Sequence, residues 1–263
     1  MTTVVDIPWP ILALFFTTLT IPLGLSRYYQ LKIEKELMIS VSRMTLQLIL
    51  VGVYLEFLFE INSLLVNLLW LAAMILIGAS SIISKTQLPI KPIFTSVALG
   101  LLVGLTPVLF LICLAVVKPT PFYNAQYLIP LAGMLLGNSL SGNIVALQNL
   151  FSSFEQRKAE YEGAISLGAS PQYATLPFVR DAIRKSIAPS MATMSTSGLV
   201  TLPGMMTGQI LGGASPMVAI KYQLMIMIAI FVMLIIAVAV TLSLTIRTNI
   251  TPSGRILTST YKN

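Results

Sequence analysis

Residues 155–189 read EQRKAEYEGAISLGASPQYATLPFVRDAIRKSIAP, and residues 199–216 read LVTLPGMMTGQILGGASP. The first stretch is polar and charged, whereas the second is apolar and punctuated by Gly and Pro. The chain on either side of this region is mostly apolar. The contrast indicates a charged segment outside a membrane that leads directly into a membrane-embedded one.

The composition places the rest of the chain in the membrane as well. Hydrophobic residues make up 56% of the 263 residues, charged residues only 10%, and the mean hydropathy is +0.88. Soluble domains carry about 25% charged residues, so this chain cannot cover itself with a polar surface. At roughly 20 residues per span, six or seven helices use most of its length. We therefore expect an all-α, polytopic helical bundle that forms one transmembrane domain over residues 1–263.

Seven apolar runs are candidate spans. They cover residues 8–25, 37–59, 63–84, 93–117, 125–150, 187–213 and 217–246. The seventh run is almost entirely aliphatic after its first turn, which favours a lipid-facing helix. The tail from 248 to 263 is short and polar, and we expect it to be mobile.

Basic residues define the orientation. Seven spans place the loops 26–36, 85–91 and 151–186 on one side, together with the C-terminal tail. That side holds 13 of the 16 basic residues: Arg27, Lys32, Lys35, Lys85, Lys91, Arg157, Lys158, Arg180, Arg184, Lys185, Arg247, Arg255 and Lys262. The positive-inside rule puts it in the cytoplasm, with the N-terminus outside and the C-terminus inside. Basic loops that face anionic lipid explain the net charge of +7, so nucleic acid is not an expected partner.

The residues that most enzymes use are scarce in this chain. It has no His and a single Cys, Cys113, so the commonest general base and the commonest transition-metal ligand are missing. No G-x-x-x-x-G-K-[ST] motif is present, so the chain cannot cradle nucleotide phosphates itself. We expect neither an enzyme nor a cofactor bound by this chain, and the sequence assigns no metal ligands.

The charged segment, residues 151–186, is predicted as two short helices that lie along the membrane face. Gly168 and Ala169 form a turn between them, with Ser170 as the N-cap of the second helix and Pro171 at its first position. Such a pair would present a compact surface to a soluble partner. Because the sixth span begins directly after it, motion of this segment would pull on that span.

Polar residues inside the spans are candidates for a substrate path, because they are costly in lipid. Glu56 either sits at the outer interface or lines a polar path with Glu60, which follows one turn later on the same face. Asn138 and Asn143 either bind substrate or hydrogen-bond neighbouring helices.

Two faces of small residues spaced four apart predict close helix packing. They comprise Gly133, Gly137 and Ser141 in the fifth span and Gly204, Gly208 and Gly212 in the sixth. Pro203 and Gly204 weaken the sixth helix, which favours a hinge and a homodimer interface; the alternative is a packing helix with a tight outer turn. Three further candidates lie beside this face: Met205, Met206 and Gln209. Thioethers suit Cu(I) better than iron, and most Met residues in membranes only pack.

The heptapeptide 162–168, EGAISLG, resembles the EAA motif of ABC-transporter permeases. In that family the motif forms the loop that sits in a groove of the ATPase subunit. This chain departs from the pattern at Gly163, and Leu176 and Pro177 follow sooner than in importers. The resemblance implies an ATPase-coupling set of Glu160, Glu162, Gly163, Ala164, Gly168, Ala169, Ser170, Pro171 and Tyr173.

Two longer strings carry a second resemblance. The strings GMLLGNSLSGN at 133–143 and LPGMMTGQILGGASP at 202–216 resemble the FetB-type iron-export permeases, a family that includes plant aluminium-tolerance relatives. The likeness extends over most of the chain from about residue 30. It implies the permease subunit of an ABC transporter in the bacterial inner membrane that exports iron or a related metal species. The expected partners are a second copy of the chain and a separate ATPase subunit, which binds ATP and Mg.

Two alternatives remain open from the residues. A gradient-driven secondary transporter or channel would need relay residues and an inverted repeat, and neither stands out in the sequence. An ABC exporter of a non-metal substrate, such as a nucleotide sugar, fits the same architecture.

Overall fold

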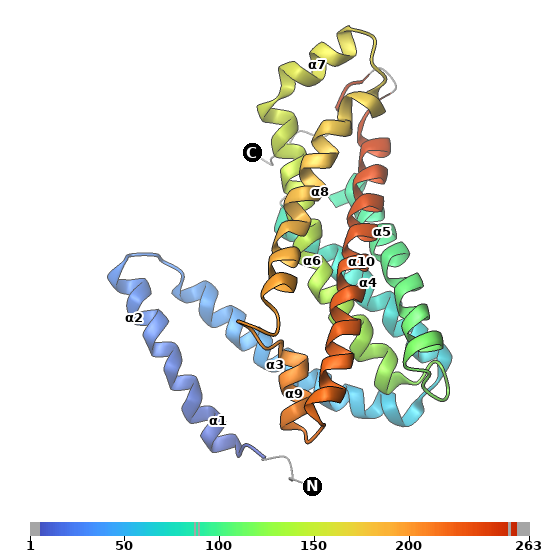
Figure 1. Cartoon of the computed structure of the whole chain (residues 1–263). Helices are drawn as coiled ribbons and strands as arrows, with labels where there is room; N and C mark the ends of the chain where they lie inside the picture. The colour runs from blue at the N-terminus through green and yellow to red at the C-terminus, as the bar shows by residue number, and fades with distance from the viewer. Residues whose placement is uncertain (1–5, 87, 89, 252–253, 257–263) are drawn as a thin grey trace.

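Helices account for nearly all of the chain. A computed structural model describes residues 6–86, 88, 90–251 and 254–256. The helices are α1 (Trp9–Phe15), α2 (Thr20–Tyr28), α3 (Glu34–Ile61), α4 (Leu64–Thr86), α5 (Ile90–Leu111), α6 (Ala125–Gln156), α7 (Lys158–Ser166), α8 (Pro171–Thr196), α9 (Gly204–Leu211) and α10 (Pro216–Asn249). A 3-10 turn (Phe16–Leu19) joins α1 to α2, and a π turn (Ile112–Val116) extends α5. The predicted all-α fold is confirmed (Figure 1).

Six segments of the described chain are long and apolar enough to cross a membrane. They are Trp9–Tyr28, Glu34–Ile61, Leu64–Thr86, Ile93–Val116, Ala125–Gln156 and Pro216–Asn249. Six of the seven predicted spans are therefore confirmed, and the exception is the run from 187 to 213. There α8 ends at Thr196, and a break over residues 197–203 separates it from α9.

The two pieces α8 and α9 together run from one end of the molecule to the other. Figure 1 shows α8 running down from α7 and α9 continuing to the far end, where α10 starts back up. The beginning of α1 and the end of α10 consequently lie at opposite ends of the molecule. This arrangement agrees with the prediction that the two termini lie on opposite sides of the membrane. Helix α7 lies at the same end of the molecule as the C-terminal end of α10.

The prediction of a second, separate surface helix is wrong. Residues 171–186 form only the first part of α8, which continues to Thr196 although Pro177 and Pro189 lie inside it. Each proline lacks the N–H that would donate to the carbonyl four residues earlier, which is that of Tyr173 for Pro177 and of Lys185 for Pro189. Proline is tolerated in membrane helices, where neighbouring groups and local adjustments compensate for the lost bond. One helix of roughly 39 Å therefore joins the charged segment to the membrane interior.

The prediction that the last span faces lipid is wrong for one of its faces. Helix α10 packs against α5, α6, α8 and α9 (Figure 1), and Met233, Leu234 and Ala237 are fully buried. Its other face is exposed at Leu224, Ile228 and Val232. The aliphatic composition of α10 therefore suits both a neighbouring apolar helix and lipid.

Close approach of α5 and α10 depends on two glycines four residues apart. A Cβ atom on Gly100 would collide with Thr241 Oγ1 and lie 2.8 Å from the carbonyl oxygen of Ala237. One on Gly104 would lie 3.0 Å from the carbonyl oxygen of Met233. The sequence analysis missed this G-x-x-x-G pair, although its spacing inside an apolar run was the available signal.

The small-residue face predicted for the fifth span does not make the close contact in α6. A Cβ atom on Gly137 would meet nothing within 4 Å, and Ser141 is exposed. The close approach is at Gly142, where a Cβ atom would collide with the side chain of Leu234 on α10. The contact face of α6 is therefore rotated relative to the predicted one, because it is set by where α10 lies.

The N-terminal helices stand away from the rest of the bundle in Figure 1. Most side chains of α1, α2 and α3 are exposed, and α3 is attached near its C-terminal end, where Leu58 is fully buried. There the side-chain oxygen of Asn62 accepts a hydrogen bond from the backbone N–H of Ala125 at 3.0 Å. On the next helix, the Asn67 amide donates to the carbonyl oxygen of Tyr123 at 2.7 Å. These two amides, Asn62 half-buried and Asn67 buried, thus fix this end of the hairpin to the start of α6.

Candidate functional site

The candidate site is the segment 158–173, which we call the coupling element; it comprises α7, the turn after it and the first turn of α8. Gly168 has φ +91°, a conformation that glycine adopts without steric cost. Its backbone N–H donates to Ile165, and the N–H of Ala169 donates to Ala164 at 3.0 Å, which closes α7 in a Schellman motif. The turn is therefore a fixed structure rather than a flexible linker.

The start of α8 follows the predicted capping pattern. The hydroxyl of Ser170 accepts a hydrogen bond from the backbone N–H of Tyr173 at 3.3 Å, and Pro171 occupies the first helical position. Both predictions are confirmed. A capped start directly after a Schellman turn fixes the angle between α7 and α8 from both sides.

Three aromatic rings join the coupling element to the bundle. Phe154 of α6, Tyr161 of α7 and Phe178 of α8 are buried, and their ring centroids lie 4.9 to 6.2 Å apart. These separations suit the tilted and edge-to-face packing that aromatic rings prefer. Because each ring comes from a different helix, the three rings pack α7 against both α6 and α8.

Arg157 adds a charged connection at the junction of α6 and α7. Its guanidinium lies 2.9 Å from Asp181 of α8, hydrogen-bonds Glu160 of α7 and sits 4.8 Å from the ring centre of Phe178. The hydrogen bond from Arg157 holds the pKa of the Glu160 carboxyl below its ordinary value. A lowered pKa means that this ion pair supports the fold at neutral pH and is lost as the pH falls through that lowered value.

The start of the C-terminal tail packs under α7. The hydroxyl of Tyr161 donates to the carbonyl oxygen of Gly254 at 2.8 Å, and Gly254 lies directly against the side chain of Ile165. The backbone N–H of Thr251 also donates to the carbonyl oxygen of Arg255 at 3.0 Å. The described part of the tail therefore makes specific contacts with α7, and its predicted mobility stays a prediction; residues 252–253 and 257–263 lie outside the described residues.

The predicted ATPase-coupling residues all come together at this end of the molecule. Six of them are exposed: Glu160, Glu162, Gly163, Gly168, Ser170 and Tyr173. Three are half-buried against the bundle: Ala164, Ala169 and Pro171. The prediction missed Leu167, which is 91% exposed at the tip of the turn. A single apolar residue before the Gly of a charged segment was the signal that could have identified it.

The predicted path residues do not form one site. Glu56 is exposed on α3, and Asn138 is exposed on α6, where its amide donates to the carbonyl oxygen of Met134 at 2.8 Å. Asn143 is fully buried, and its side-chain oxygen has no hydrogen-bond partner among the described residues. The three side chains therefore lie in different surroundings.

The predicted glycine face lies on α9 and has no neighbour within the described chain. Pro203 precedes α9 as its N-cap instead of weakening a continuous helix, because the helix only begins at Gly204. A Cβ atom on Gly204 or Gly208 would meet nothing within 4 Å. Gly212 ends the helix, as predicted. This face is therefore free of intramolecular packing.

Three residues predicted to lie beside the glycine face have separate positions. Met205 packs against the main hydrophobic core. Met206 lines a pocket at the break between α8 and α9. The side-chain oxygen of Gln209 is buried without a hydrogen-bond partner among the described residues. The structure therefore separates the two methionines that the sequence places together.

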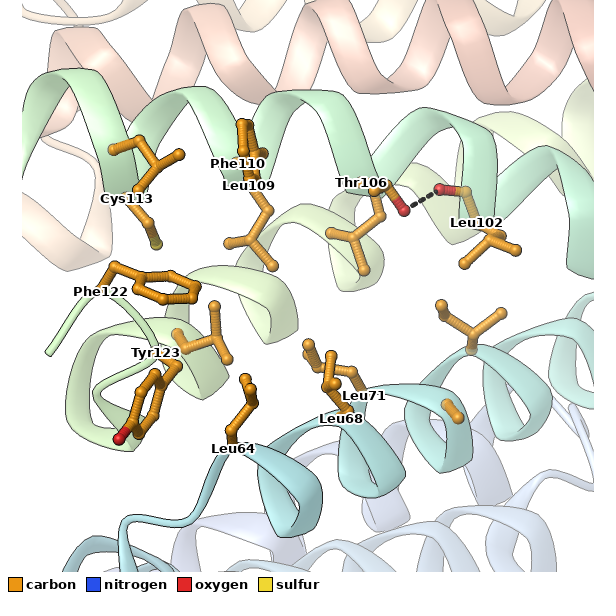
Figure 2. A pocket seen from close by; sticks show the side chains of 15 residues that line it. Leu64, Leu68, Leu71, Leu102, Thr106, Leu109, Phe110, Cys113, Phe122 and Tyr123 are labelled. Carbon is orange, nitrogen blue, oxygen red and sulfur yellow. Dashed lines mark hydrogen bonds between the residues drawn. The ribbon is translucent and has the colours of Figure 1, made fainter.

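A second pocket, between α4, α5 and the loop before α6, is apolar. Figure 2 shows this cavity of about 240 Å³ with leucines on both sides and the rings of Phe122 and Tyr123 at one end. The hydroxyl of Thr106 donates a hydrogen bond within its own helix, to the carbonyl oxygen of Leu102 at 2.7 Å. No carboxylate lines this cavity, so it does not offer the oxygen ligands that hard metal ions prefer.

Comparison with known proteins relates this architecture to one family. The profile of the family described as "Uncharacterised protein family (UPF0014)" matches residues 9–250. The chain belongs to the UPF0014 family. No solved structure matches this UPF0014 chain.

Named relatives of this UPF0014 protein come from plants and bacteria. "Protein ALUMINUM SENSITIVE 3" of Arabidopsis thaliana is 36% identical over 83% of this chain and 78% of its own length. "Probable iron export permease protein FetB" of Escherichia coli is 33% identical over 82% of both chains. "UPF0014 membrane protein YjkA" of Bacillus subtilis is 32% identical over 82% of this chain and 85% of its own length. The predicted resemblance is confirmed, and the chain is a multi-pass membrane protein.

A Tyr161→Phe substitution in this UPF0014 protein is expected to loosen the coupling element without unfolding the bundle. The change removes the hydrogen bond to Gly254 and leaves a buried carbonyl oxygen without its donor, at a cost of about 1 kcal/mol. Thermal unfolding in detergent should show Tm lowered by roughly 2–4 °C, and hydrogen exchange should quicken in residues 250–256. Tyr173→Phe is the matched control, since Tyr173 is 71% exposed, and an equal effect in both variants would contradict the prediction.

Proposed function

We propose that this chain is the membrane-spanning permease subunit of an ATP-driven ABC transporter that exports iron or a related metal species. The observation that carries the proposal is the coupling element, an exposed and internally fixed turn joined to two membrane helices by Phe154, Tyr161 and Phe178. Iron as the substrate rests on the printed name of the Escherichia coli relative. The chain would bind no nucleotide itself, so ATP and Mg would belong to a separate ATPase subunit.

The geometry supports a route from ATP hydrolysis to the membrane. A partner that grips the turn at Leu167 and Gly168 would move α7, and the aromatic contacts would pass that displacement to α8. Because α8 is continuous from Pro171 to Thr196, the displacement would reach the break over residues 197–203. The break would absorb it as a change in the angle between α8 and α9, which is how hinges act in domain motions.

The open face of α9 supports a homodimer. Gly204 and Gly208 leave room for a second helix, and small residues four apart allow close helix contact in membranes. Next to them Leu199 is 91% exposed and Val200 is 79% exposed. A second copy that covers this face would place the two breaks near the symmetry axis.

Exposed polar groups on α6 and α8 support a substrate path. Asn138 is exposed on α6, and residues 191–196 of α8 are exposed although they include Thr193 and Ser195. Polar side chains inside a membrane generally face protein or water rather than lipid. We place the path between the copies, along these two helices.

Reconstitution with the cognate ATPase tests the proposed function. The chain and the ATPase should co-purify as a complex, and Fe²⁺ should stimulate ATP hydrolysis in proteoliposomes. Stimulation by a nucleotide sugar and not by iron would overturn the substrate but keep the transporter class. Absence of any stable complex with the ATPase would overturn the transporter class itself.

A Gly208→Leu substitution tests the homodimer. The bulky side chain has space within the protomer, since a Cβ atom on Gly208 meets nothing within 4 Å, but it would hold a second helix away. We expect the variant to fold and to run as a monomer in crosslinking and light scattering. Gly24→Leu on α2 is the matched control, because Gly24 also faces open space. An intact, active dimer of the Gly208 variant would refute this interface.

A further inference from the structure

The break between α8 and α9 encloses a pocket of about 330 Å³ against α10. It is formed by the end of α8, the break itself, the start of α9 and the first half of α10. These are the pieces that the proposed function sets in relative motion. A molecule bound here would touch all of them at once.

Three methionines from three different helices line this pocket. They are Met194 of α8, Met206 of α9 and Met227 of α10. Methionine side chains have three rotatable bonds and a polarisable sulfur, so they can adjust to a bound ion. Convergence of thioethers from three separate elements goes beyond what filling one helix interface requires.

Gln223 of α10 provides the second observation. It lines the same pocket, is only 8% exposed, and its side-chain oxygen has no hydrogen-bond partner among the described residues. A buried amide oxygen without a partner is costly. The nearby hydroxyl of Ser197 already donates to the carbonyl oxygen of Thr193 at 2.7 Å. The oxygen itself is buried, so a rotation of the Gln223 side chain would bring it to an ion in the pocket.

The charge of the pocket defines what it can hold. No Asp or Glu lines it, so a hard ion of high charge would find neither compensating charge nor enough oxygen ligands. Thioethers favour soft ions such as Cu(I), and a monovalent ion leaves less charge to compensate in a membrane interior. We propose that this pocket binds a soft monovalent cation of the Cu(I) class, with Met194, Met206 and Met227 as thioether ligands and the Gln223 oxygen beside them.

Binding in this pocket would also connect the moving parts. An ion held by α8, α9 and α10 together fixes the angle at the break, and opening the break removes ligands from it. As a cargo site the pocket rests on the transporter class of the proposed function, with a soft ion in place of iron as the cargo; as a binding site it does not depend on that function. Uptake and release would follow from the number of thioethers that reach the ion in each conformation.

Silver ion is the probe, because Ag⁺ shares the ligand preference of Cu(I) and is not readily oxidised. The purified full-length chain in chloride-free detergent buffer is titrated with Ag⁺ by calorimetry, and Fe²⁺ is titrated in parallel. Loss of outer-shell partners alone costs about 10–100-fold in metal affinity, and we expect the double variant Met206→Leu with Met227→Leu to lose at least as much. Leu for Met conserves volume and costs little stability, so the fold is kept.

The double variant Met38→Leu with Met44→Leu is the matched control, because both residues lie on α3 away from the pocket. Its affinity for Ag⁺ should stay within about twofold of wild type. Equal Ag⁺ affinity in the pocket variant and the control, or tighter binding of Fe²⁺ than of Ag⁺, would overturn the site.

Co-purification of the same variants with the ATPase separates the two proposals. A pocket variant that loses Ag⁺ but keeps the ATPase supports the site and leaves the transporter class standing. Wild-type protein that binds the ATPase but not Ag⁺ overturns the site alone. Wild-type protein that binds Ag⁺ at the pocket but not the ATPase overturns the proposed function and supports the binding site.

Discussion

A Leu167→Glu substitution is expected to abolish association with the ATPase while leaving the membrane bundle intact. Leu167 is 91% exposed at the end of α7, so the folded protein loses no buried contact when the side chain changes. In a complex, an apolar side chain at the centre of a docking surface contributes about 2 kcal/mol or more, and a buried unpaired charge costs a further 2–5 kcal/mol. Affinity should therefore fall by roughly 1,000-fold or more.

The measurement is affinity capture of the ATPase by the detergent-purified variant, together with thermal unfolding of the variant alone. Thr248→Glu is the matched control, since it places the same charge on an exposed position at the end of α10. The control should keep the complex, and both variants should unfold within about 2 °C of wild type. Full ATPase binding by the Leu167 variant would move the docking site away from this turn.

A Gly100→Ala substitution adds a single methyl group and is nevertheless expected to lower the stability of the helix bundle strongly. The added methyl group would collide with Thr241 and press on the backbone of Ala237, and neither can move without separating α5 from α10. Overpacking of this kind costs about 1–3 kcal/mol, which corresponds to a fall in Tm of roughly 2–12 °C. Thermal unfolding in detergent and the yield of folded protein measure it.

Gly137→Ala is the natural comparison, because a Cβ atom there meets nothing within 4 Å. Removing a glycine from a helix interior gains up to about 1 kcal/mol of helix propensity, so Tm should be unchanged or slightly raised. If Gly100→Ala and Gly137→Ala behave alike, the α5–α10 contact is not as close as described. The double variant Gly100→Ala with Thr241→Ala should recover part of the lost stability, because the added methyl group no longer meets the Thr241 hydroxyl.

Local features of this chain could be predicted from sequence because they depend on a few adjacent residues. Ser170 and Pro171 start a helix by their own hydrogen bonding and backbone angles, and Gly168 accepts a left-handed conformation. The apolar runs located six helices long and apolar enough to cross a membrane, because length and hydropathy alone decide this property. The turn and the helix start of the coupling element were predicted for these reasons, whereas its coupling role is implied by the resemblance.

The features that the sequence did not reveal are decided by contacts between distant segments. Hydropathy cannot distinguish lipid from a neighbouring apolar helix, so α10 was expected outside the bundle although Leu234 is fully buried. The methionine pocket needs Met194, Met206 and Met227 to meet across three helices. Sequence adjacency instead favoured Met205, which packs into the core.

The central position of α10 has a consequence for biogenesis. Helix α10 is synthesised after α5 and α6, so both must be inserted before the helix that they pack against leaves the ribosome. Gly100, Gly104 and Gly142 would have no helix to pack against during that interval. Assembly must then wait until α10 has been made, and messages truncated before residue 216 should yield chains that quality-control proteases remove rather than partly working subunits.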